Sequence, residues 1–388
     1  MFKNLLLLFS FLGTVTVSEA QPKQKKVLFV IVDGISADTK EKINTPNLDA
    51  IAKVGGYTRA YVGGGKGTYS QTPTISAVGY NSLLTGTWVN KHNVWDNDIK
   101  DPNYNYWTIF RFFKEQYPHK QTAVFSTWLD NRTKLLGDGL PQTNGLRTDY
   151  FFDGFELDTI QFPHDPEKKY IHLIDEQVVA DAATVIENKG PDLSWVYLEY
   201  TDDMGHRYGD SEQFHKAVEI MDVQMGRLWR AIKAREAAHA EDWQIYITTD
   251  HGRDASKGQN HGGQSDRERS TWMVTNAQNL NQAFDTKEGP GIVDIMPSVA
   301  RHLDVHFPKE QSFEIDGIPL VGELSLMNPA VKKMDKKLTI SWKALGKNQP
   351  LKIWLTTTNH FEEGKQDLYH LVKTVKLEDQ NAEIDISK

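Results

Sequence analysis

The sequence contains no cysteine, and this absence excludes several kinds of chemistry together. Disulfide bridges, thiolate metal ligands and lipid attachment through cysteine all require a thiol. Any metal site must therefore use oxygen and nitrogen ligands. Carboxylate and imidazole ligands suit Zn²⁺, or Mn²⁺ and similar ions in its place.

Long runs of like charge, internal repeats and low-complexity segments are also missing, although the net charge is −8 over 388 residues. Without a basic surface, the chain is not expected to bind a nucleic-acid polymer. A small phosphate-bearing substrate remains compatible, because metal ions can supply local positive charge. The length is enough for a large catalytic domain and a smaller module.

The one prominent apolar run lies at the N-terminus. Lys3 precedes an apolar run at 5–17, and Ser18-Glu19-Ala20 offers a small-x-small cleavage site. The run is shorter than the roughly 20 residues that a bilayer span needs. We expect residues 1–20 to be a signal peptide, with an N-terminal membrane anchor as the alternative. The mature protein should then be exported, periplasmic or secreted, with no membrane span.

Hydrophobic strand patterns alternate with helical patterns over the first 300 residues. Strands are predicted at 25–34, 121–127, 193–200, 243–250 and 270–276, and helices at 45–56, 170–190, 211–238 and 291–303. This alternation predicts an α/β fold, with a central mostly parallel sheet flanked by helices. Beyond residue 330, short alternating segments predict a small all-β, sandwich-like module. The predicted domains are 21–328 and 329–388.

Six potential metal ligands lie near the ends of predicted strands or in the following loops. They are Asp33, Asp202, His206, Asp250, His251 and His261. Each motif alone fits a turn, a helix cap or a loop hydrogen bond. Because ligands of parallel sheets bind beyond the carboxyl ends of the strands, the residues together predict a site for two metal ions. Two ions roughly 4 Å apart promote in-line displacement at phosphorus or sulfur.

These motifs resemble the alkaline phosphatase superfamily in their order along the chain, over residues 25–305. The order is strand-Asp, a hydroxyl nucleophile, Asp-x-x-Gly-His, Asp-His-Gly and a final His. The nearest resemblance is to the nucleotide pyrophosphatase/phosphodiesterase-like branch. It implies an alkaline-phosphatase-like fold, two Zn²⁺ ions (or other divalent ions) and hydrolysis of a small phosphate ester through a covalent intermediate.

The resemblance also implies how the ligands divide between the two ions. One ion would take Asp33, the nucleophile, Asp250 and His251, and the other would take Asp202, His206 and His261. Asp202 fits better than Asp203, because the family carboxylate lies four positions before the histidine.

The nucleophile is assigned through the same resemblance. In the family it begins a helix ten positions before the Gly of a Leu/Val-Thr-Gly element, which here ends at Gly86. This spacing points to Ser76, with Thr74 as the nearest rival. A helix N-terminus stabilises anions, so an alkoxide and a phosphate are both favoured there.

Substrate preference rests on three positions. The diesterase branch carries Asn three positions after the nucleophile, where this chain has Gly79. Asn97, twenty-one positions after Ser76, matches a phosphate-binding Asn of some monoesterase relatives. Arg132 is the second candidate phosphate ligand, with a surface salt bridge as its alternative. These residues favour monoesters narrowly over diesters.

Three other functions are weighed against phosphate ester hydrolysis. A sulfatase needs Cys/Ser-x-Pro/Ala-x-Arg, but the segment beginning at Ser76 has Val78 and Tyr80 at the two diagnostic positions. A phosphonate hydrolase of the same superfamily is a second alternative. A non-catalytic exported binding protein that retains the fold would be expected to lack a ligand, yet all six are present.

Overall fold

The computed structural model describes residues 22–387. The predicted signal peptide at 1–20 lies outside these residues. Among the described residues, no helix combines the length and the apolar character that crossing a membrane requires.

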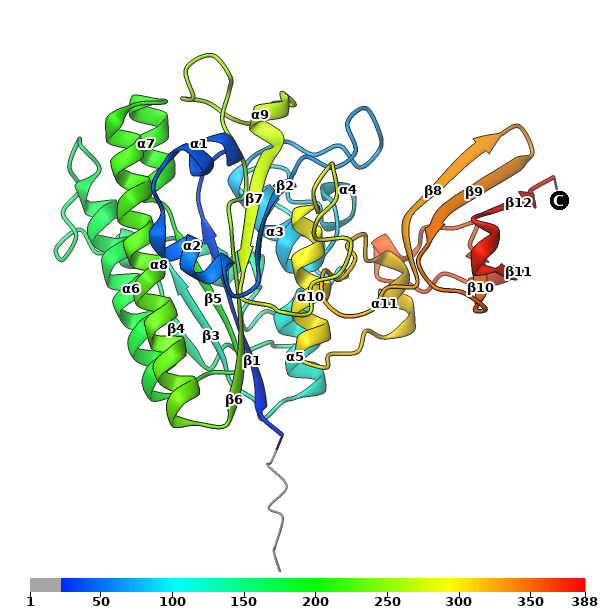
Figure 1. The fold of residues 1–388 in the computed structure, drawn as a ribbon, viewed down its shortest axis with the longest axis horizontal. Coiled ribbons are helices and arrows are strands. Elements are labelled where there is room, and N and C mark those ends of the chain that lie inside the picture. The colour runs from blue at the N-terminus through cyan, green and yellow to red at the C-terminus, as the bar shows by residue number, and fades with distance from the viewer. Residues whose placement is uncertain (1–21, 388) are drawn as a thin grey trace, which may run out of the picture.

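A seven-stranded sheet forms the centre of the larger part of the molecule (Figure 1). Its strands, in chain order, are β1 (Gln24–Val32), β2 (Gly56–Tyr61), β3 (Thr122–Ser126), β4 (Tyr150–Phe152), β5 (Leu193–Leu198), β6 (Glu241–Thr248) and β7 (Ser270–Thr275). The spatial order is β2-β7-β6-β1-β5-β3-β4. Strands β6, β1, β5, β3 and β4 pair in parallel, whereas β7 runs antiparallel to both of its neighbours, β6 and β2. The mostly parallel sheet is therefore confirmed, and β2 and β4 are strands that the hydrophobic pattern did not predict.

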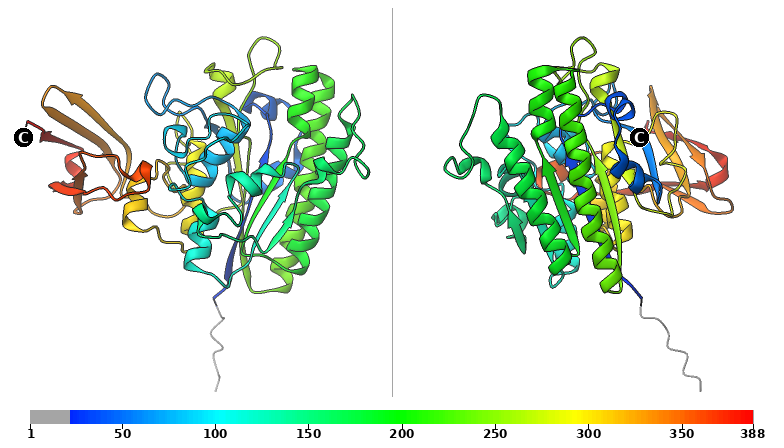
Figure 2. Two further views of the ribbon diagram at one scale, coloured as in Figure 1. Left: turned by 180° about the vertical axis from the view of Figure 1, so that it is seen from behind. Right: turned by 60° about the vertical axis from the view of Figure 1, so that its left-hand side comes forward.

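Helices cover both faces of this sheet, as Figure 2 shows. The α-helices of the described residues are α1 (Ala37–Lys42), α2 (Pro46–Ala52), α3 (Ser76–Thr85), α4 (Val89–His92), α5 (Ile109–Gln116), α6 (Lys169–Asn188), α7 (Tyr200–Tyr208), α8 (Glu212–Ala238), α9 (Asp266–Arg269), α10 (Ile295–His302) and α11 (Lys309–Glu314). Successive residues of β1 enter different cores. Val30 packs with residues of α6 and α8, and Phe29 packs with residues of α3, α5 and α10. Burial on both faces explains why β1 is a continuous apolar run.

One element differs from its sequence-based interpretation. The segment after β5 was expected to be a loop, but Tyr200–Tyr208 forms helix α7. Asp202 and His206 are four positions apart and therefore lie on one face of this helix. The i,i+4 spacing holds the two side chains more rigidly than a loop would.

The C-terminal module is entirely β apart from two short 3₁₀ turns. Its strands are β8 (Leu326–Met334), β9 (Lys337–Ala344), β10 (Pro350–Leu355), β11 (His370–Lys376) and β12 (Asn381–Asp385). Strands β12, β9 and β8 form one sheet, and β10 and β11 form another. Trp342, Leu377 and Ala382 make up its small buried core. The predicted boundary at 328/329 falls inside β8.

The module contacts the larger part through α11 and a loop before α5. The Tyr369 hydroxyl donates to Glu314 Oε1 at 2.8 Å, and the Phe313 and Tyr369 rings lie 4.3 Å apart. Asn103 donates to the Glu362 carbonyl at 2.9 Å. Figure 1 places the module to one side of the sheet.

Candidate functional site

The carboxyl edge of the sheet brings all six predicted ligands together in two groups. Asp33, Asp250 and His251 form the first group, and Asp202, His206 and His261 form the second. Within each group the ligand atoms lie within 4.8 Å of one another. Asp33 directly follows β1, Asp250 and His251 follow β6, and the second group combines α7 with the loop before α9. Residues more than 200 positions apart therefore converge because β1 and β6 are neighbours.

The first group has the donor chemistry of a buried cation site. Asp33 Oδ1 and Asp250 Oδ2 lie 3.2 and 3.3 Å from His251 Nε2. Both oxygens are buried and have no hydrogen-bond partner among the described residues. The other Asp33 oxygen accepts from the hydroxyls of Tyr80 and Tyr197. Because an unpartnered buried carboxylate oxygen is costly, these atoms fit a bound cation.

The second group directs three ligand atoms toward one another. Asp202 Oδ2 and His261 Nε2 lie 3.2 and 3.0 Å from His206 Nε2. His261 Nδ1 contacts the Thr74 carbonyl at 2.8 Å, and because a carbonyl only accepts, Nδ1 carries the proton. This bond leaves the Nε2 lone pair of neutral His261 facing the group. Such an outer hydrogen bond is typical of metal-binding histidines.

The two groups adjoin each other. The His251 and His261 rings stack with centroids 3.6 Å apart. His251 Nδ1 donates to the Gly252 carbonyl at 2.9 Å, so its Nε2 faces the first group. The two imidazole rings therefore form the boundary between the two groups.

Burial and charge set the protonation of these histidines when no ion is bound. Burial lowers the pKa of His251, but the carboxylates of Asp250 and Asp33 outweigh it and raise the pKa to about 9. Burial and the neighbouring His251 charge lower the pKa of His261 to about 4. A metal ion must therefore displace a proton from His251 at neutral pH, whereas His261 is already neutral.

Ser76 is the first residue of α3 and lies at the first group. Its side chain is buried, and Oγ lies 3.4 Å from His251 Nε2. Thr74 has a different environment, because its hydroxyl donates to the Gly263 carbonyl at 3.0 Å and accepts from Gly262 N at 2.9 Å. Of the two candidate nucleophiles, only Ser76 has its hydroxyl directed to a predicted ligand.

Asn97 also lies beside the start of α3. Its Oδ1 accepts from Ala77 N at 2.9 Å, which orients the side-chain amide next to Ser76. Its Nδ2 group donates no hydrogen bond to another described residue and remains free to donate to a substrate.

Gly79 packs directly against Asp250. A Cβ at position 79 would lie 2.8 Å from the Asp250 carbonyl oxygen and 2.9 Å from its Cβ. This contact leaves no room for the Asn that the diesterase branch carries at the same position.

Arg132 is engaged away from the two groups. Its Nε donates to Asp153 at 2.6 Å and its Nη1 donates to Asp138 at 3.0 Å. Both carboxylates are nearly buried, at 2 % and 5 % side-chain exposure. Among the described residues, Arg132 makes no hydrogen bond or ion pair with either ligand group. Arg132 thus forms a nearly buried salt bridge, whereas the alternative considered from the sequence was a surface one.

Sequence reasoning missed the residues that support the ligands. Tyr80 and Tyr197 hold Asp33, and their hydroxyls face it only because α3 and β5 pack beside β1. Arg253, which is fully buried, contacts Asp202. The one local signal for it was an arginine directly after Asp-His-Gly.

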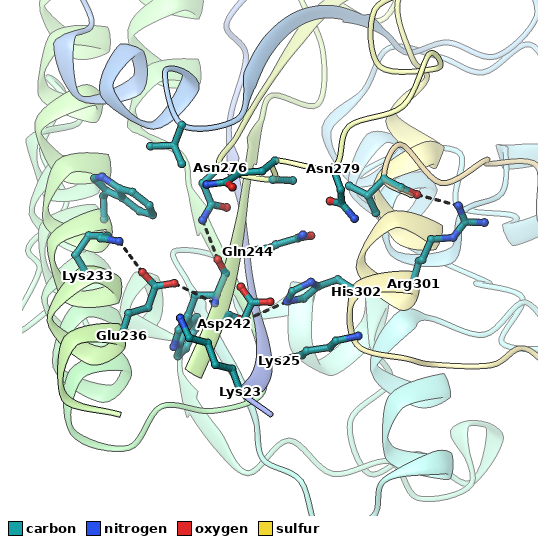
Figure 3. A pocket seen from close by; sticks show the side chains of 16 residues that line it. Lys23, Lys25, Lys233, Glu236, Asp242, Gln244, Asn276, Asn279, Arg301 and His302 are labelled. Atoms are coloured by element: carbon teal, nitrogen blue, oxygen red, sulfur yellow. Dashed lines mark hydrogen bonds and ion pairs between the residues drawn. The ribbon is translucent and has the colours of Figure 1, made fainter. Parts of the chain in front are cut away.

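A cavity of about 550 Å³ lies at the opposite edge of the sheet (Figure 3). Lys25 and Asp242, near the starts of β1 and β6, are among its lining residues. Lys233 pairs with Glu236 at 2.7 Å, and His302 donates to the Asp242 carbonyl at 3.1 Å. The cavity is thus separate from the two ligand groups and contributes no residue to them.

The fold and parts of the sequence have solved and curated relatives. Residues 27–283 match the model of the type I phosphodiesterase / nucleotide pyrophosphatase family. Human ectonucleotide pyrophosphatase/phosphodiesterase family member 7 is 27% identical over 247 residues, 60% of this chain and 49% of the relative. Human family member 5 is also 27% identical, over 61% of this chain and 46% of the relative. The chain thus spans about half the length of the curated relatives it matches.

Solved structures show the same fold at lower identity. Murine ectonucleotide pyrophosphatase/phosphodiesterase 5 has a TM-score of 0.51 and 16% identity, covering 73% of this chain and 96% of its own. A 2-O GAG sulfatase has a TM-score of 0.54 and 11% identity, covering 94% of this chain and 85% of its own. The family model covers more than half of the chain and includes every residue of both ligand groups. The chain therefore belongs to the type I phosphodiesterase / nucleotide pyrophosphatase family.

Proposed function

We propose that the protein is a two-metal phosphoric ester hydrolase that forms a phosphoseryl intermediate on Ser76. The observation that carries the proposal is the pair of adjoining oxygen and nitrogen ligand groups beside the Ser76 hydroxyl. The buried, unpartnered oxygens of Asp33 and Asp250 support the presence of cations. The donor set suits two Zn²⁺ ions, with other divalent ions as substitutes.

Bound ions would supply positive charge to the phosphoryl oxygens and the leaving oxygen, and would lower the pKa of the hydroxyl and of a water molecule. The residues of the chain perform the remaining tasks. Ser76 Oγ attacks phosphorus, the Oγ–P bond forms, and the bond from phosphorus to the leaving oxygen breaks. Water then cleaves the phosphoseryl ester and regenerates the serine.

Donors at the start of α3 stabilise the charge that develops on phosphorus. The helix N-terminus favours the phosphoryl group electrostatically, and Asn97 Nδ2 is a free donor beside it. Asn97 thus takes over the role of the asparagine that Gly79 excludes.

We propose phosphodiesters or pyrophosphates as the preferred substrates. The narrow preference for monoesters predicted from the sequence depended on Asn97 and Arg132 as two phosphate donors. Arg132 is engaged by Asp138 and Asp153, so one of the donors for a doubly charged phosphate is unavailable. Relatives named pyrophosphatase/phosphodiesterase support the same choice.

Sulfate ester hydrolysis is less well supported. Tyr80 stands where a sulfatase requires arginine, and its hydroxyl donates to Asp33. We also propose that the protein is exported, which the signal-like N-terminus and the ectoenzyme names of the relatives support.

A substrate panel tests the proposal. The purified, zinc-loaded protein is assayed on p-nitrophenyl phosphate, bis-p-nitrophenyl phosphate, a p-nitrophenyl phosphonate and p-nitrophenyl sulfate, with metal content measured by mass spectrometry. We expect two metal equivalents, fastest turnover of the diester and loss of activity in chelator. Absence of metal together with insensitivity to chelator would refute the metal mechanism. A preference for the monoester by orders of magnitude would refute only the substrate choice.

A further inference from the structure

Arg253 lies between the carboxyl ends of the strands and α7. It is fully buried. Its Nε donates to the Gly34 carbonyl at 2.8 Å, and its Nη2 donates to the Asp202 carbonyl at 2.8 Å and to Asp202 Oδ1. A buried arginine is unusual unless its charge is compensated, and here the partner is a ligand of the second group.

Two glycines that adjoin predicted ligands make room for this guanidinium group. A Cβ at Gly34 would lie 2.6 Å from Arg253 Nη2, and a Cβ at Gly205 would overlap Arg253 Cζ. Gly34 follows Asp33 and Gly205 precedes His206 in the chain. Gly34 and Gly205, each beside one predicted ligand, therefore leave the space that the Arg253 guanidinium occupies.

The hydrogen bonds of Arg253 determine which Asp202 oxygen is available. Oδ1 is taken by the guanidinium, whereas Oδ2 lies 3.2 Å from His206 Nε2 within the second group. The planar guanidinium reaches three acceptors at once, which a lysine ammonium on a flexible stem does not do with the same geometry. Asp202 is therefore held in one orientation with a single oxygen facing His206.

We propose that Arg253 is a positioning residue for the second metal ion. It acts by holding Asp202 in place with a fixed, fully buried positive charge. This inference rests on the proposed two-metal function. The positive charge by itself would repel a cation. The inference therefore requires that orientation of Asp202 outweighs this repulsion.

Zinc titrations of the full-length chain against a chromophoric chelator test the inference. Wild type is compared with Arg253→Met, Arg253→Lys and Gly205→Ala, the last of which displaces the guanidinium without removing it. Arg235→Met is the control, because Arg235 also pairs with a buried carboxylate, that of Glu241, but contacts neither ligand group. Melting temperatures are recorded with zinc and with chelator.

We expect wild type and Arg235→Met to bind two ions with the same affinities. Arg253→Met should bind one of the two ions 10- to 100-fold more weakly, the range for loss of a residue that orients a metal ligand. Gly205→Ala should show the same selective loss, and Arg253→Lys an intermediate one. Arg253→Met should also lower the melting temperature more in zinc than in chelator, because weaker binding of one ion reduces the stabilisation that zinc gives to the folded protein.

The two proposals fail in different ways. If wild type binds no zinc, the two-metal function is wrong. If wild type binds two ions and folded Arg253→Met or Gly205→Ala binds both as tightly or more tightly, the positioning role is wrong. Should Arg253→Met not fold, Gly205→Ala and Arg253→Lys decide the question.

Discussion

The replacement Gly79→Ala tests whether α3 packs so tightly against the predicted ligand Asp250 that an added methyl group displaces it. The added methyl group would lie 2.8 Å from the Asp250 carbonyl oxygen and 2.9 Å from the Asp250 Cβ. Both distances are below ordinary van der Waals contact, so either α3 or Asp250 must move. Because Asp250 and His251 are consecutive, such a movement disturbs two ligands of the first group.

Opposing contributions set the expected change in stability. Alanine in a helix interior is favoured over glycine by about 1 kcal/mol. Overpacking a buried site by one methyl group costs roughly 1–3 kcal/mol. The free energy of unfolding should therefore fall by about 0–2 kcal/mol. Displacement of a ligand should reduce zinc affinity at one site by about 10- to 100-fold.

Urea unfolding, zinc titration and kcat/KM on bis-p-nitrophenyl phosphate measure these effects. Gly67→Ala is the matched control, because a Cβ there meets no atom within 4 Å, although the φ of +73° carries its own strain. It should lose stability without losing zinc affinity. A Gly79→Ala protein that is about 1 kcal/mol more stable and fully active would refute the claim that α3 packs tightly against Asp250. Gly79→Asn should likewise fail to improve diester hydrolysis.

Further predictions concern the nucleophile, the supporting residues and pH. Ser76→Ala should lose most turnover while Zn²⁺ titration still shows two ions, and phosphate trapped at low pH should be found on Ser76 in wild type. Thr74→Val should weaken one zinc site because its hydroxyl holds the Gly262–Gly263 backbone, whereas Thr74→Ser should bind zinc like wild type. Asn97→Ala should slow the diester reaction by a hundredfold or more, about 3 kcal/mol of transition-state stabilisation, with little change in melting temperature. Arg132→Ala should show the reverse. Its free energy of unfolding in urea should fall by about 3–5 kcal/mol, because two nearly buried carboxylates are left unpaired. The kcat of the protein that remains folded should stay near that of wild type. In chelator, the raised pKa of His251, about 9 when folded against about 6.5 when unfolded, stabilises the protein fully below pH 6.5. This contribution disappears as the pH rises through 9, so the melting temperature should fall over that interval in wild type and not in His251→Gln.

The sequence by itself determined the α/β class, the main strands and the types of metal ligand. A strand such as β1, buried on both faces, must be apolar along its whole length, so its run of residues and the Asp33 that follows it are visible locally. The order of the motifs also identifies the superfamily, because it depends only on residue types and spacing. The absence of cysteine limited the ligands to oxygen and nitrogen in the same way.

Tertiary structure alone decided which of these residues act together. Thr74 and Ser76 are both hydroxyl residues two positions apart, and only packing directs one to the His261 loop and the other to His251. The salt bridges of Arg132 depend on contacts with Asp153, twenty-one positions away. The placement of Arg253 against Asp202 depends on the meeting of two separate strand ends. Such contacts are fixed by the summed packing of the sheet and its helices, and a local pattern of residue types does not contain that information.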